Sequence, residues 1–359
     1  MKGEITINSS KNSAVAILLA SLLNDGKTTI TNLPKIEEVF RIIEILESIG
    51  VKTAWRGKVL KIFPPKKLKL GKLDIEAALK TRIMILLIGI LAHKFKKFSL
   101  PFSGGCKLGK RTVTPHIYAL EKFGIKIKVK EREYKISRNK LIPGKNIVMY
   151  ESGDTATENT ILAAALIEGK TVIKFASANY QVQDLCYFLA GLGVKIEGIR
   201  TTTLTVFGKE NLNQEYSFQL SEDPIEAMFF LAAAIVTKSS ITIKRCPLEY
   251  LELELFKLEK MGFQYKIAKE YKSENGFARL TDIKTYPSEL IAPEEKIYGR
   301  PYPGLNIDNL PFFVPIAAQA TGKTLIHDWV YENRAIYYTE LNRLGAKIDL
   351  ADTHRVFIK

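Results

Sequence analysis

A short pattern that recurs five times constrains the fold of this 359-residue chain more than any other feature. An apolar helical turn runs into a glycine, and an apolar residue follows directly. A helix that ends at a left-handed glycine and passes straight into a strand is typical of this pattern. Successive copies lie 74, 69, 69 and 83 residues apart, at Gly50, Gly124, Gly193, Gly262 and Gly345. The repeat therefore predicts five similar junctions between a helix and a strand.

A second repeated element lies upstream of these glycines. It is an almost wholly apolar helix, followed by a short turn and a β-branched strand, in residues 14–30, 159–173, 228–243 and 313–326. Helices that are apolar nearly all round are buried on all sides. Each unit therefore reads as strand, buried helix, strand, amphipathic helix, strand, strand, and five such units fill the chain.

The helix that precedes each glycine is expected to be amphipathic. Before the first glycine, one helical face carries the apolar residues Val39, Ile42, Ile43, Leu46 and Ile49. The segment 250–255 alternates strictly and would by itself be assigned to a strand. Its position in the repeat favours a helix instead. A polar, turn-rich stretch at 208–219 separates the third unit from the fourth, and we predict a linker there.

The charge balance narrows the classes of partner. Lysines and arginines number 53 against 38 acidic residues, which gives a formal net charge of +15. A basic surface can bind nucleic acid, or it can attract small anionic molecules. Because the lysines are scattered and no aromatic-rich basic block occurs, we expect small anions and no nucleic acid. The densest cluster, at 66–73, is expected to form a loop and the edge of a strand.

Several protein classes are excluded by what the sequence lacks. The longest apolar run, Ile83–Ala92, is too short to span a bilayer, so we expect a buried helix and no membrane partner. No secretory leader is visible, and three widely spaced cysteines favour a reducing, cytoplasmic location. The four histidines show no metal-ligand spacing, and neither G-x-G-x-x-G nor a Walker A motif occurs. We therefore expect no metal and no cofactor.

The most unusual local sequence is the segment 99–111, SLPFSGGCKLGKR, which we call the cysteine loop. Its three glycines let the backbone approach a ligand closely. Cys106 has the cations Lys107, Lys110 and Arg111 nearby, and such neighbours stabilise a thiolate and make it reactive. A buried, inert cysteine is the alternative. We interpret Cys106 as functional, and Cys186 and Cys246 as buried structural cysteines.

Three further segments allow a functional and a structural interpretation. Lys11 and Asn12 directly precede a buried helix, where they form either an anion site or a simple cap made by Asn12 or Ser13. Asp308 lies in a loop rich in proline and glycine, and by itself it is most simply an N-cap or turn residue. Arg334 is compatible with a surface position. His93, His327 and His354 are interpreted as structural hydrogen-bonding residues, whereas His116 lies ten positions after Cys106 and is left unassigned.

Taken together, these segments resemble the UDP-N-acetylglucosamine enolpyruvyl transferases over essentially the whole chain. The resemblance depends on KN at 11–12, NLPKIEEV at 32–39, KTR at 80–82, the cysteine loop, TATEN at 155–159, the loop around Asp308 and YENR at 331–334. The sibling family that makes 5-enolpyruvylshikimate 3-phosphate shares the repeats but lacks the catalytic cysteine loop.

The resemblance implies an α/β fold, a two-domain inside-out α/β barrel built from βαβαββ units. Five units are expected here where the family has six. The first domain would comprise residues 11–213, with three units and the cysteine loop. The second would comprise residues 1–10 and 214–359, with two units, and would be incomplete. Apolar faces left uncovered by the absent unit would favour a monomer that associates weakly.

The resemblance also implies a reaction. The enolpyruvyl group of phosphoenolpyruvate would be transferred to the 3′-hydroxyl of UDP-N-acetylglucosamine with release of phosphate. Cys106 would protonate the methylene carbon, and Asp308 would accept the proton of the sugar hydroxyl. Lys11 and Arg111 would bind the phosphate and carboxylate of phosphoenolpyruvate. The nucleotide sugar would contact Asn12, Arg82, Arg111, Thr112, Val113, Thr114, Pro115, Asp308 and Val330, with Thr155 and Arg334 in supporting positions.

The sequence departs from the family at several of these positions. Phe102 and Ser103 lengthen the cysteine loop, Thr114 replaces an aspartate, Thr155 replaces a glycine, and Glu151 replaces an upstream lysine. Two alternatives therefore stay open beside the transferase. One is a catalytically weak relative that only binds nucleotide sugar, and the other is an enolpyruvyl transferase with a different nucleotide substrate.

Overall fold

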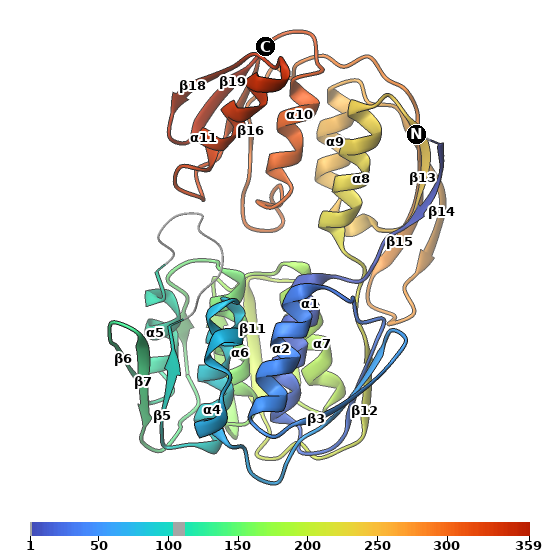
Figure 1. Cartoon of the computed structure of the whole chain (residues 1–359). Coiled ribbons are helices and arrows are strands. Elements are labelled where there is room, and N and C mark those ends of the chain that lie inside the picture. The colour runs from blue at the N-terminus through green and yellow to red at the C-terminus, as the bar shows by residue number, and fades with distance from the viewer. Residues whose placement is uncertain (1, 103–111) are drawn as a thin grey trace. The chain divides into compact units, whose positions relative to one another are not determined.

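The computed structural model describes residues 2–102 and 112–359, which form two compact units (Figure 1). The N-terminal unit comprises residues 9–102 and 112–220, and the C-terminal unit comprises residues 2–8 and 221–359. The predictions made for Cys106 and Arg111 concern residues outside the described part of the chain.

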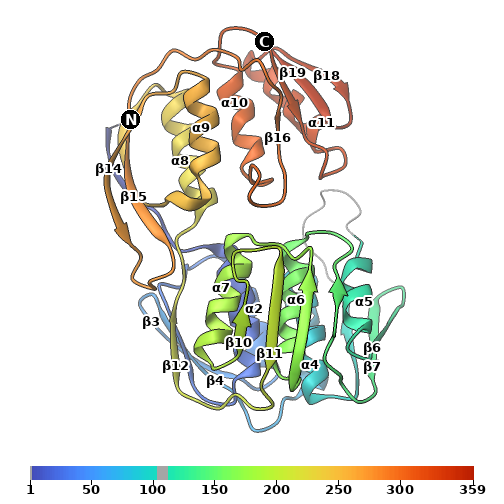
Figure 2. The same ribbon diagram turned by 180° about the vertical axis from the view of Figure 1, so that it is seen from behind.

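Three sheets surround the helices of the N-terminal unit (Figure 2). The first and the third sheet each have one edge strand hydrogen-bonded in parallel, and the second consists of three antiparallel strands. In sheet order the strands are β12 (Tyr216–Gln219), β2 (Thr28–Thr31), β4 (Val59–Phe63) and β3 (Lys52–Arg56); β5 (Lys97–Pro101), β7 (Glu133–Arg138) and β6 (Ile125–Val129); and β10 (Lys195–Glu197), β11 (Thr203–Gly208), β9 (Gly169–Lys174) and β8 (Ile147–Val148).

The apolar helices fill the inside of this unit, as the repeat predicts. Side chains from Ala14 to Ala20 are at most 2% exposed, and those from Ile161 to Ala165 are fully buried. An inside-out arrangement follows, because helices form the core and sheets the exterior. The helices are α1 (Lys11–Ala20), α2 (Glu37–Ser48), α3 (Ile75–Leu79), α4 (Leu87–Lys94), α5 (Thr114–Glu121), α6 (Asp154–Ala165) and α7 (Tyr180–Gly191), with short 3-10 turns η1 (Ser21–Leu23), η2 (Leu70–Lys72) and η3 (Ile83–Leu86).

The C-terminal unit repeats this design with two sheets among its described residues. The first has the order β1 (Lys2–Thr6), β13 (Ser240–Pro247), β15 (Arg279–Thr285) and β14 (Tyr265–Lys272). The second has the order β16 (Ile297–Tyr298), β17 (Thr324–His327), β19 (Arg355–Ile358) and β18 (Ile348–Asp352). The helical elements are α8 (Pro224–Val236), η4 (Leu248–Tyr250), α9 (Glu252–Lys260), η5 (Leu310–Phe312), α10 (Phe313–Ala317), α11 (Arg334–Tyr338) and η6 (Thr339–Leu344).

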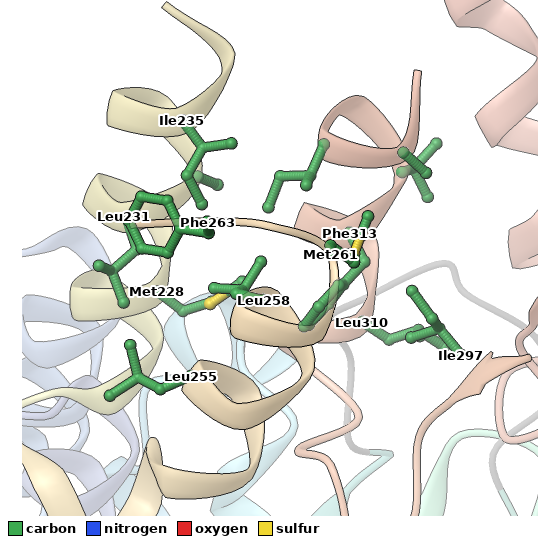
Figure 3. Packing of buried hydrophobic residues seen from close by; sticks show 14 of the residues in the cluster. Met228, Leu231, Ile235, Leu255, Leu258, Met261, Phe263, Ile297, Leu310 and Phe313 are labelled. Atoms are coloured by element: carbon green, nitrogen blue, oxygen red, sulfur yellow. The ribbon is translucent and has the colours of Figure 1, made fainter. Parts of the chain in front are cut away.

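The core of the C-terminal unit lies between α8, α9 and α10. Side chains such as Leu231 from α8, Leu258 from α9 and Phe313 from α10 are fully buried and point toward one another (Figure 3). The prediction that α8 is buried on all sides is wrong in part. Phe229 is 49% exposed and packs edge-on against Phe312, with ring centroids 6.0 Å apart. Two described sheets therefore leave one apolar face of this helix uncovered.

All five repeat glycines adopt the left-handed conformation that the pattern predicts. Their φ angles lie between +85° and +102°. In four copies the glycine follows an α-helix, and in the last it follows η6. A side chain is disfavoured at such φ values, so these positions select glycine. The ambiguous segment 250–255 contributes to η4 and α9, which confirms the helical interpretation.

Two expectations about loops are wrong. Residues 66–73 are hydrogen-bonded to none of the described sheets, so they form a loop that contains η2 and not the edge of a strand. The expected linker at 208–219 includes strand β12, which is hydrogen-bonded in parallel to β2. Strand β1 likewise precedes α1 in the chain but pairs with β13. β12 thus completes a sheet of the N-terminal unit although it directly precedes the C-terminal segment 221–359 in the chain. In the same way β1 completes a sheet of the C-terminal unit although it directly precedes the N-terminal unit.

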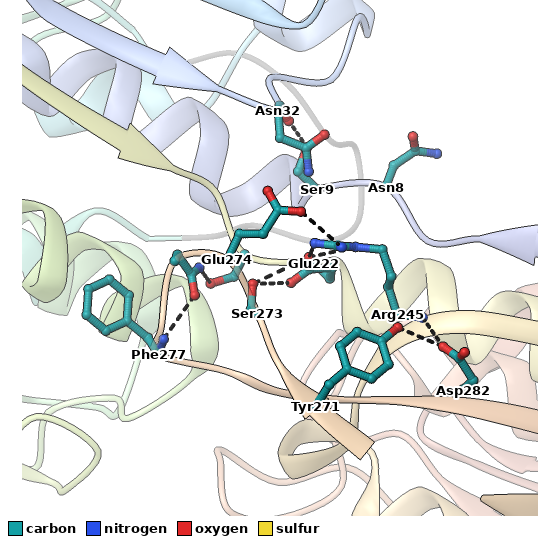
Figure 4. Close-up of polar contacts among 12 residues, drawn as sticks. Asn8, Ser9, Asn32, Glu222, Arg245, Tyr271, Ser273, Glu274, Phe277 and Asp282 are labelled. Carbon is teal, nitrogen blue, oxygen red and sulfur yellow. Dashed lines mark hydrogen bonds and ion pairs between the residues drawn. The ribbon is translucent and has the colours of Figure 1, made fainter. Parts of the chain in front are cut away.

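A buried ion pair fixes the start of the C-terminal unit after residue 220. The Glu222 carboxylate is inaccessible to solvent, and it accepts hydrogen bonds from the Arg245 guanidinium and, at 3.1 Å, from Ser273 Oγ (Figure 4). Arg245 lies at an irregularity of β13 with a φ of 63°. Its backbone N–H donates to Asp282 at 3.1 Å. This network replaces the ladder hydrogen bonds that the irregular strand loses.

Candidate active site

The residues predicted to form the site are divided between the two units. The N-terminal unit carries Lys11, Asn12, Arg82, residues 112–115 and Thr155, whereas the C-terminal unit carries Asp308, Val330 and Arg334. No helix among the described residues is both long and apolar enough to cross a bilayer.

Lys11 and Asn12 form the first turn of α1. Ser10 is the N-cap, and its hydroxyl accepts a hydrogen bond from the Ser13 N–H at 3.1 Å. The capping role considered for Asn12 or Ser13 is therefore wrong, and the side chains of Lys11 and Asn12 have other partners. Asn12 Nδ2 donates to the Tyr180 hydroxyl at 3.0 Å. A cation and an amide thus lie at the end of α1 that favours anions.

The ammonium group of Lys11 is held by an acidic residue. Lys11 Nζ lies 2.9 Å from Glu38 Oε2, and the other carboxylate oxygen of Glu38 accepts a hydrogen bond from Thr81 Oγ1 at 2.8 Å. The Lys11 side chain stays 48% exposed. It is therefore oriented by Glu38 and accessible to an anionic ligand.

Arg82 and the segment 112–115 lie together in the N-terminal unit. Arg82 Nη2 donates to the Thr112 carbonyl at 3.4 Å. The hydroxyl oxygens of Thr112 and Thr114 are hydrogen-bonded at 2.6 Å, and the Thr114 N–H donates to Thr112 Oγ1 at 3.1 Å. Val113 precedes α5, and Pro115 occupies its first turn, where a missing N–H costs nothing. The structure brings these five predicted residues into one neighbourhood.

A buried polar network lies beneath this segment. Asn159 Nδ2 donates to the Ile85 carbonyl at 3.0 Å and contacts His116 Nδ1 at 3.2 Å. Gly89 N–H donates to Asn159 Oδ1 at 3.0 Å, and a Cβ at Gly89 would approach this oxygen to 2.5 Å. Burial, together with the Arg82 charge, lowers the pKa of His116 to about 3. His116 is therefore neutral and belongs to this buried network.

The segment 151–159 places its residues at the start of α6. Thr155 is partly buried in the first turn, and Glu151 is exposed. Asp154 accepts a hydrogen bond from Asn179 Nδ2 at 3.1 Å. Glu158 is buried, and neither of its carboxylate oxygens has a hydrogen-bond partner among the described residues. Burial raises the pKa of Glu158 well above its usual range, with the Asp154 charge adding to the effect.

Asp308 lies in the loop that precedes η5 and is exposed. It is not the N-cap, because Asn309 occupies that position. The Asp308 N–H donates to Asn306 Oδ1 at 2.9 Å, and the Tyr331 hydroxyl lies 3.5 Å from Asp308 Oδ1. Val330 is partly buried and adjoins Tyr331 in the chain. Asp308 therefore presents its carboxylate to solvent on an ordered turn, which suits a proton acceptor.

Two buried charged residues hold the Asp308 loop from either side. Glu254, on α9, is 2% exposed, and its Oε1 accepts hydrogen bonds from the Asn306 N–H at 3.1 Å and from Asn309 Nδ2 at 2.9 Å. Arg334 Nη2 donates to the Ile307 carbonyl at 2.9 Å. The residues just before and after Asp308 are thus fixed by α9 and α11.

Arg334 is itself anchored by Asp328, so the expectation of a surface position is wrong. Arg334 is 7% exposed, and its guanidinium donates to both carboxylate oxygens of Asp328. The guanidinium also lies over the Tyr331 ring, 4.3 Å from the centroid. Because the ion pair is buried, Arg334 cannot leave it without a large cost.

Glu38, Glu254 and Asp328 were not predicted from the sequence. Acidic residues are usually solvated, so their local pattern gave no reason to place them beside the site. A weak signal exists for Asp328, which lies six residues before Arg334 in HDWVYENR. Cys186 and Cys246 are buried as predicted, and burial raises the pKa of both thiols. Both are therefore unreactive thiols at neutral pH.

Comparisons with known proteins agree with this architecture. The family model of EPSP synthase (3-phosphoshikimate 1-carboxyvinyltransferase) matches residues 1–357. A UDP-N-acetylglucosamine 1-carboxyvinyltransferase of Sulfurovum sp. is 33% identical over 97% of this chain and 80% of its own length. One from Borreliella burgdorferi is 32% identical over 99% of this chain and 82% of its own length.

Solved structures show the same fold. The enolpyruvyl transferase NikO from Streptomyces tendae superposes with a TM-score of 0.82 at 19% identity, covering 99% of this chain and 81% of that one. An EPSP synthase from Acinetobacter baumannii gives a TM-score of 0.69 at 18% identity, covering 100% of this chain and 81% of that one. The described structure is therefore an enolpyruvyl transferase fold. By the family model and by these relatives, the chain belongs to the EPSP synthase family, among the UDP-N-acetylglucosamine 1-carboxyvinyltransferases.

Proposed function

We propose that this chain transfers the enolpyruvyl group of phosphoenolpyruvate to the 3′-hydroxyl of UDP-N-acetylglucosamine and releases inorganic phosphate. The observation that carries the proposal is the similarity, at about one third identity over 97–99% of the chain, to relatives named for this reaction. The product would enter peptidoglycan synthesis in the cytoplasm, where it would support cell-wall formation, cell shape and division.

The chemistry assigns a role to each candidate residue. The sugar oxygen bonds to C2 of phosphoenolpyruvate while Cys106 donates a proton to the methylene carbon, and Asp308 accepts the hydroxyl proton. Loss of a methyl proton and cleavage of the C–O bond to phosphate then restore the double bond. No electrons are gained or lost, so no redox cofactor is needed, and because phosphate leaves from a carbon centre by addition and elimination, we expect no metal.

Binding of the two anionic substrates is assigned to the cationic and polar residues. Lys11 and Arg111 would bind phosphoenolpyruvate, and the exposure of Lys11 beside Glu38 supports this role. Asn12, Arg82, Val330 and residues 111–115 would bind the nucleotide sugar, with Thr155 in support. The contact of Arg82 with Thr112 supports a shared subsite. We expect the active form to be a monomer or a weak oligomer.

The test of the acceptor is product analysis by mass spectrometry. Purified chain with phosphoenolpyruvate is supplied in parallel with UDP-N-acetylglucosamine, with other nucleotide sugars and with shikimate 3-phosphate. The proposal predicts an enolpyruvyl adduct of UDP-N-acetylglucosamine at the highest rate.

The same experiment separates the alternatives. The observation that favours a different nucleotide concerns Thr114. The family has an aspartate at this position, whereas here the Thr114 hydroxyl is hydrogen-bonded to that of Thr112. A faster reaction with another nucleotide sugar would establish that alternative. Tight binding of UDP-N-acetylglucosamine by calorimetry, without any adduct, would instead establish a binding protein.

A further inference from the structure

The N-terminal unit contains a cavity of about 520 Å³ that the proposed reaction does not use. Its lining comes from three places in the chain: the residues after α1, the loop between β4 and η2, and the end of α4. The lining residues are Leu22, Asp25, Pro64, Pro65, Lys66, Lys67, Leu68, Lys94 and Phe95. We call it the β4–η2 pocket. Its volume is in the range of pockets that hold small molecules, roughly 300–1,000 Å³.

Helix geometry separates the β4–η2 pocket from the candidate active site. Lys11 begins α1, whereas Leu22 lies in η1 directly after α1 ends. Ten helical residues at about 1.5 Å each put the two ends of α1 roughly 15 Å apart. In the same way Arg82 precedes η3, and Lys94 ends α4. The site residues are thus at the beginnings of these helical segments, and the residues that line the pocket are at their ends.

The three lysines that line the pocket differ in their partners. Lys94 has two structural reasons for its position, because it ends α4, where cations are favoured, and its Nζ lies 2.7 Å from Asp25 Oδ1. Lys66 and Lys67 have neither reason. They are exposed residues of a loop, and neither forms an ion pair with a residue in the described ranges. Because both line the pocket, two ammonium groups are available to an anion that binds there.

The loop that carries these lysines is already ordered. Pro64 and Pro65 fix two successive φ angles directly before them. Leu68 is 7% exposed, and the Lys69 N–H donates to the Ile49 carbonyl at 2.9 Å. Little backbone entropy would therefore be lost when a ligand binds. The remaining walls, Leu22, Leu68, the two prolines and Phe95, are apolar.

We propose that the β4–η2 pocket binds a small organic anion, with its phosphate or carboxylate at Lys66 and Lys67 and an apolar or aromatic body against Leu22, Leu68 and Phe95. An inorganic anion would leave the apolar walls unused, and a neutral ring would leave the cations unpaired. The proposal does not depend on the proposed function, since no residue of this pocket takes part in the reaction.

The test is calorimetric titration of the full chain with 1-naphthyl phosphate, with 1-naphthol and inorganic phosphate as comparison ligands. The decisive variant is Lys66→Ala/Lys67→Ala. Its matched control is Lys69→Ala/Lys72→Ala, which removes the same charge from the same lysine cluster but not from the pocket. Lys11→Ala serves to detect binding at the candidate active site. Thermal unfolding of each variant verifies that it is folded.

The proposal predicts that 1-naphthyl phosphate binds more tightly than either comparison ligand, and that Lys66→Ala/Lys67→Ala weakens it roughly tenfold or more. The control pair and Lys11→Ala would change the affinity less than about twofold. Equal weakening by the control pair would show a non-specific charge effect and overturn the proposal. So would loss of binding in Lys11→Ala, or no binding by the unmodified chain.

Discussion

Arg334 donates hydrogen bonds to both carboxylate oxygens of Asp328 inside the C-terminal unit, where the two residues are 7% and 1% exposed. The same guanidinium donates to the Ile307 carbonyl at 2.9 Å. A buried ion pair thus determines the position of the residue next to Asp308. Arg334 is a positioning residue, because it acts on the proposed proton acceptor through the backbone.

Replacing Arg334 tests this relationship. Arg334→Ala leaves the Asp328 carboxylate buried and unpaired, and the free energy of unfolding should fall by about 3–5 kcal/mol. Arg334→Lys retains the charge but not the planar fork, so it should be folded and show a lower kcat with a nearly unchanged KM. Urea denaturation and steady-state kinetics measure the two effects.

The control is Arg343→Ala, which removes an exposed arginine paired with Glu340. Exposed pairs contribute about 0–1 kcal/mol, so this variant should match the unmodified chain. Similar losses in the Arg334 and Arg343 alanine variants would contradict the anchoring role.

Glu254 is expected to position the other side of the same loop. Glu254→Leu removes the acceptor of two hydrogen bonds, from the Asn306 N–H and Asn309 Nδ2, and orphaned buried donors cost about 1–3 kcal/mol each. Glu254→Gln keeps one acceptor oxygen and should retain most of the activity. Glu252→Leu, on the same helix, is the control, because Glu252 is exposed. If Glu254→Leu has the kcat of the control, the loop does not depend on Glu254.

His116 makes stability depend on pH. Its pKa is about 3 in the folded chain and about 6.5 in the unfolded chain, so the unfolded state binds the proton first. The contribution to stability is therefore complete above pH 6.5 and is lost as the pH falls toward 3. Between pH 7.5 and 5 the loss should be roughly 2 kcal/mol for this residue.

The measurement is urea denaturation of the unmodified chain and of His116→Gln at both pH values. Glutamine offers an oxygen to Asn159 and does not titrate, so the variant should lose less stability on acidification. An identical loss in both proteins would show that His116 is not the group responsible.

Cys106 is expected to be the single reactive cysteine. The epoxide fosfomycin is opened by a thiolate, which forms a C–S bond while the epoxide C–O bond breaks and its oxygen takes up a proton. Cys186 and Cys246 are buried with raised thiol pKa values, so they should not react. Intact-mass analysis should show one adduct that is absent from Cys106→Ala. An adduct on Cys186 or Cys246 would contradict the assignment.

Local sequence patterns predicted most of the fold. The glycine junctions were predictable because the left-handed conformation at Gly50 and its four counterparts depends on neighbouring residues only. The buried helices were predictable because their apolar residues cover every face. The pairing of β1 with β13 was not predictable, because it joins segments more than two hundred residues apart and leaves no local sequence pattern.

The sequence indicated candidate site residues but not the residues that position them. Lys11, Asn12, Arg82 and Asp308 became candidates because short motifs around them resemble a known family. The residues that hold them in place, such as Glu38 and Glu254, are ordinary helix carboxylates in sequence. Their roles depend on tertiary contacts, with Thr81 and Lys11 in one unit and with Asn306 and Asn309 in the other.

The most direct test of the proposed reaction is the release of inorganic phosphate by the purified 359-residue chain with phosphoenolpyruvate and UDP-N-acetylglucosamine. Cys106→Ser and Asp308→Asn are measured alongside, and each should lower kcat by roughly 10²–10⁴, as expected when an acid or a base is removed. We expect release that requires both substrates and both residues. A folded chain that binds the nucleotide sugar but releases no phosphate, or that releases it equally well in both variants, would contradict the account.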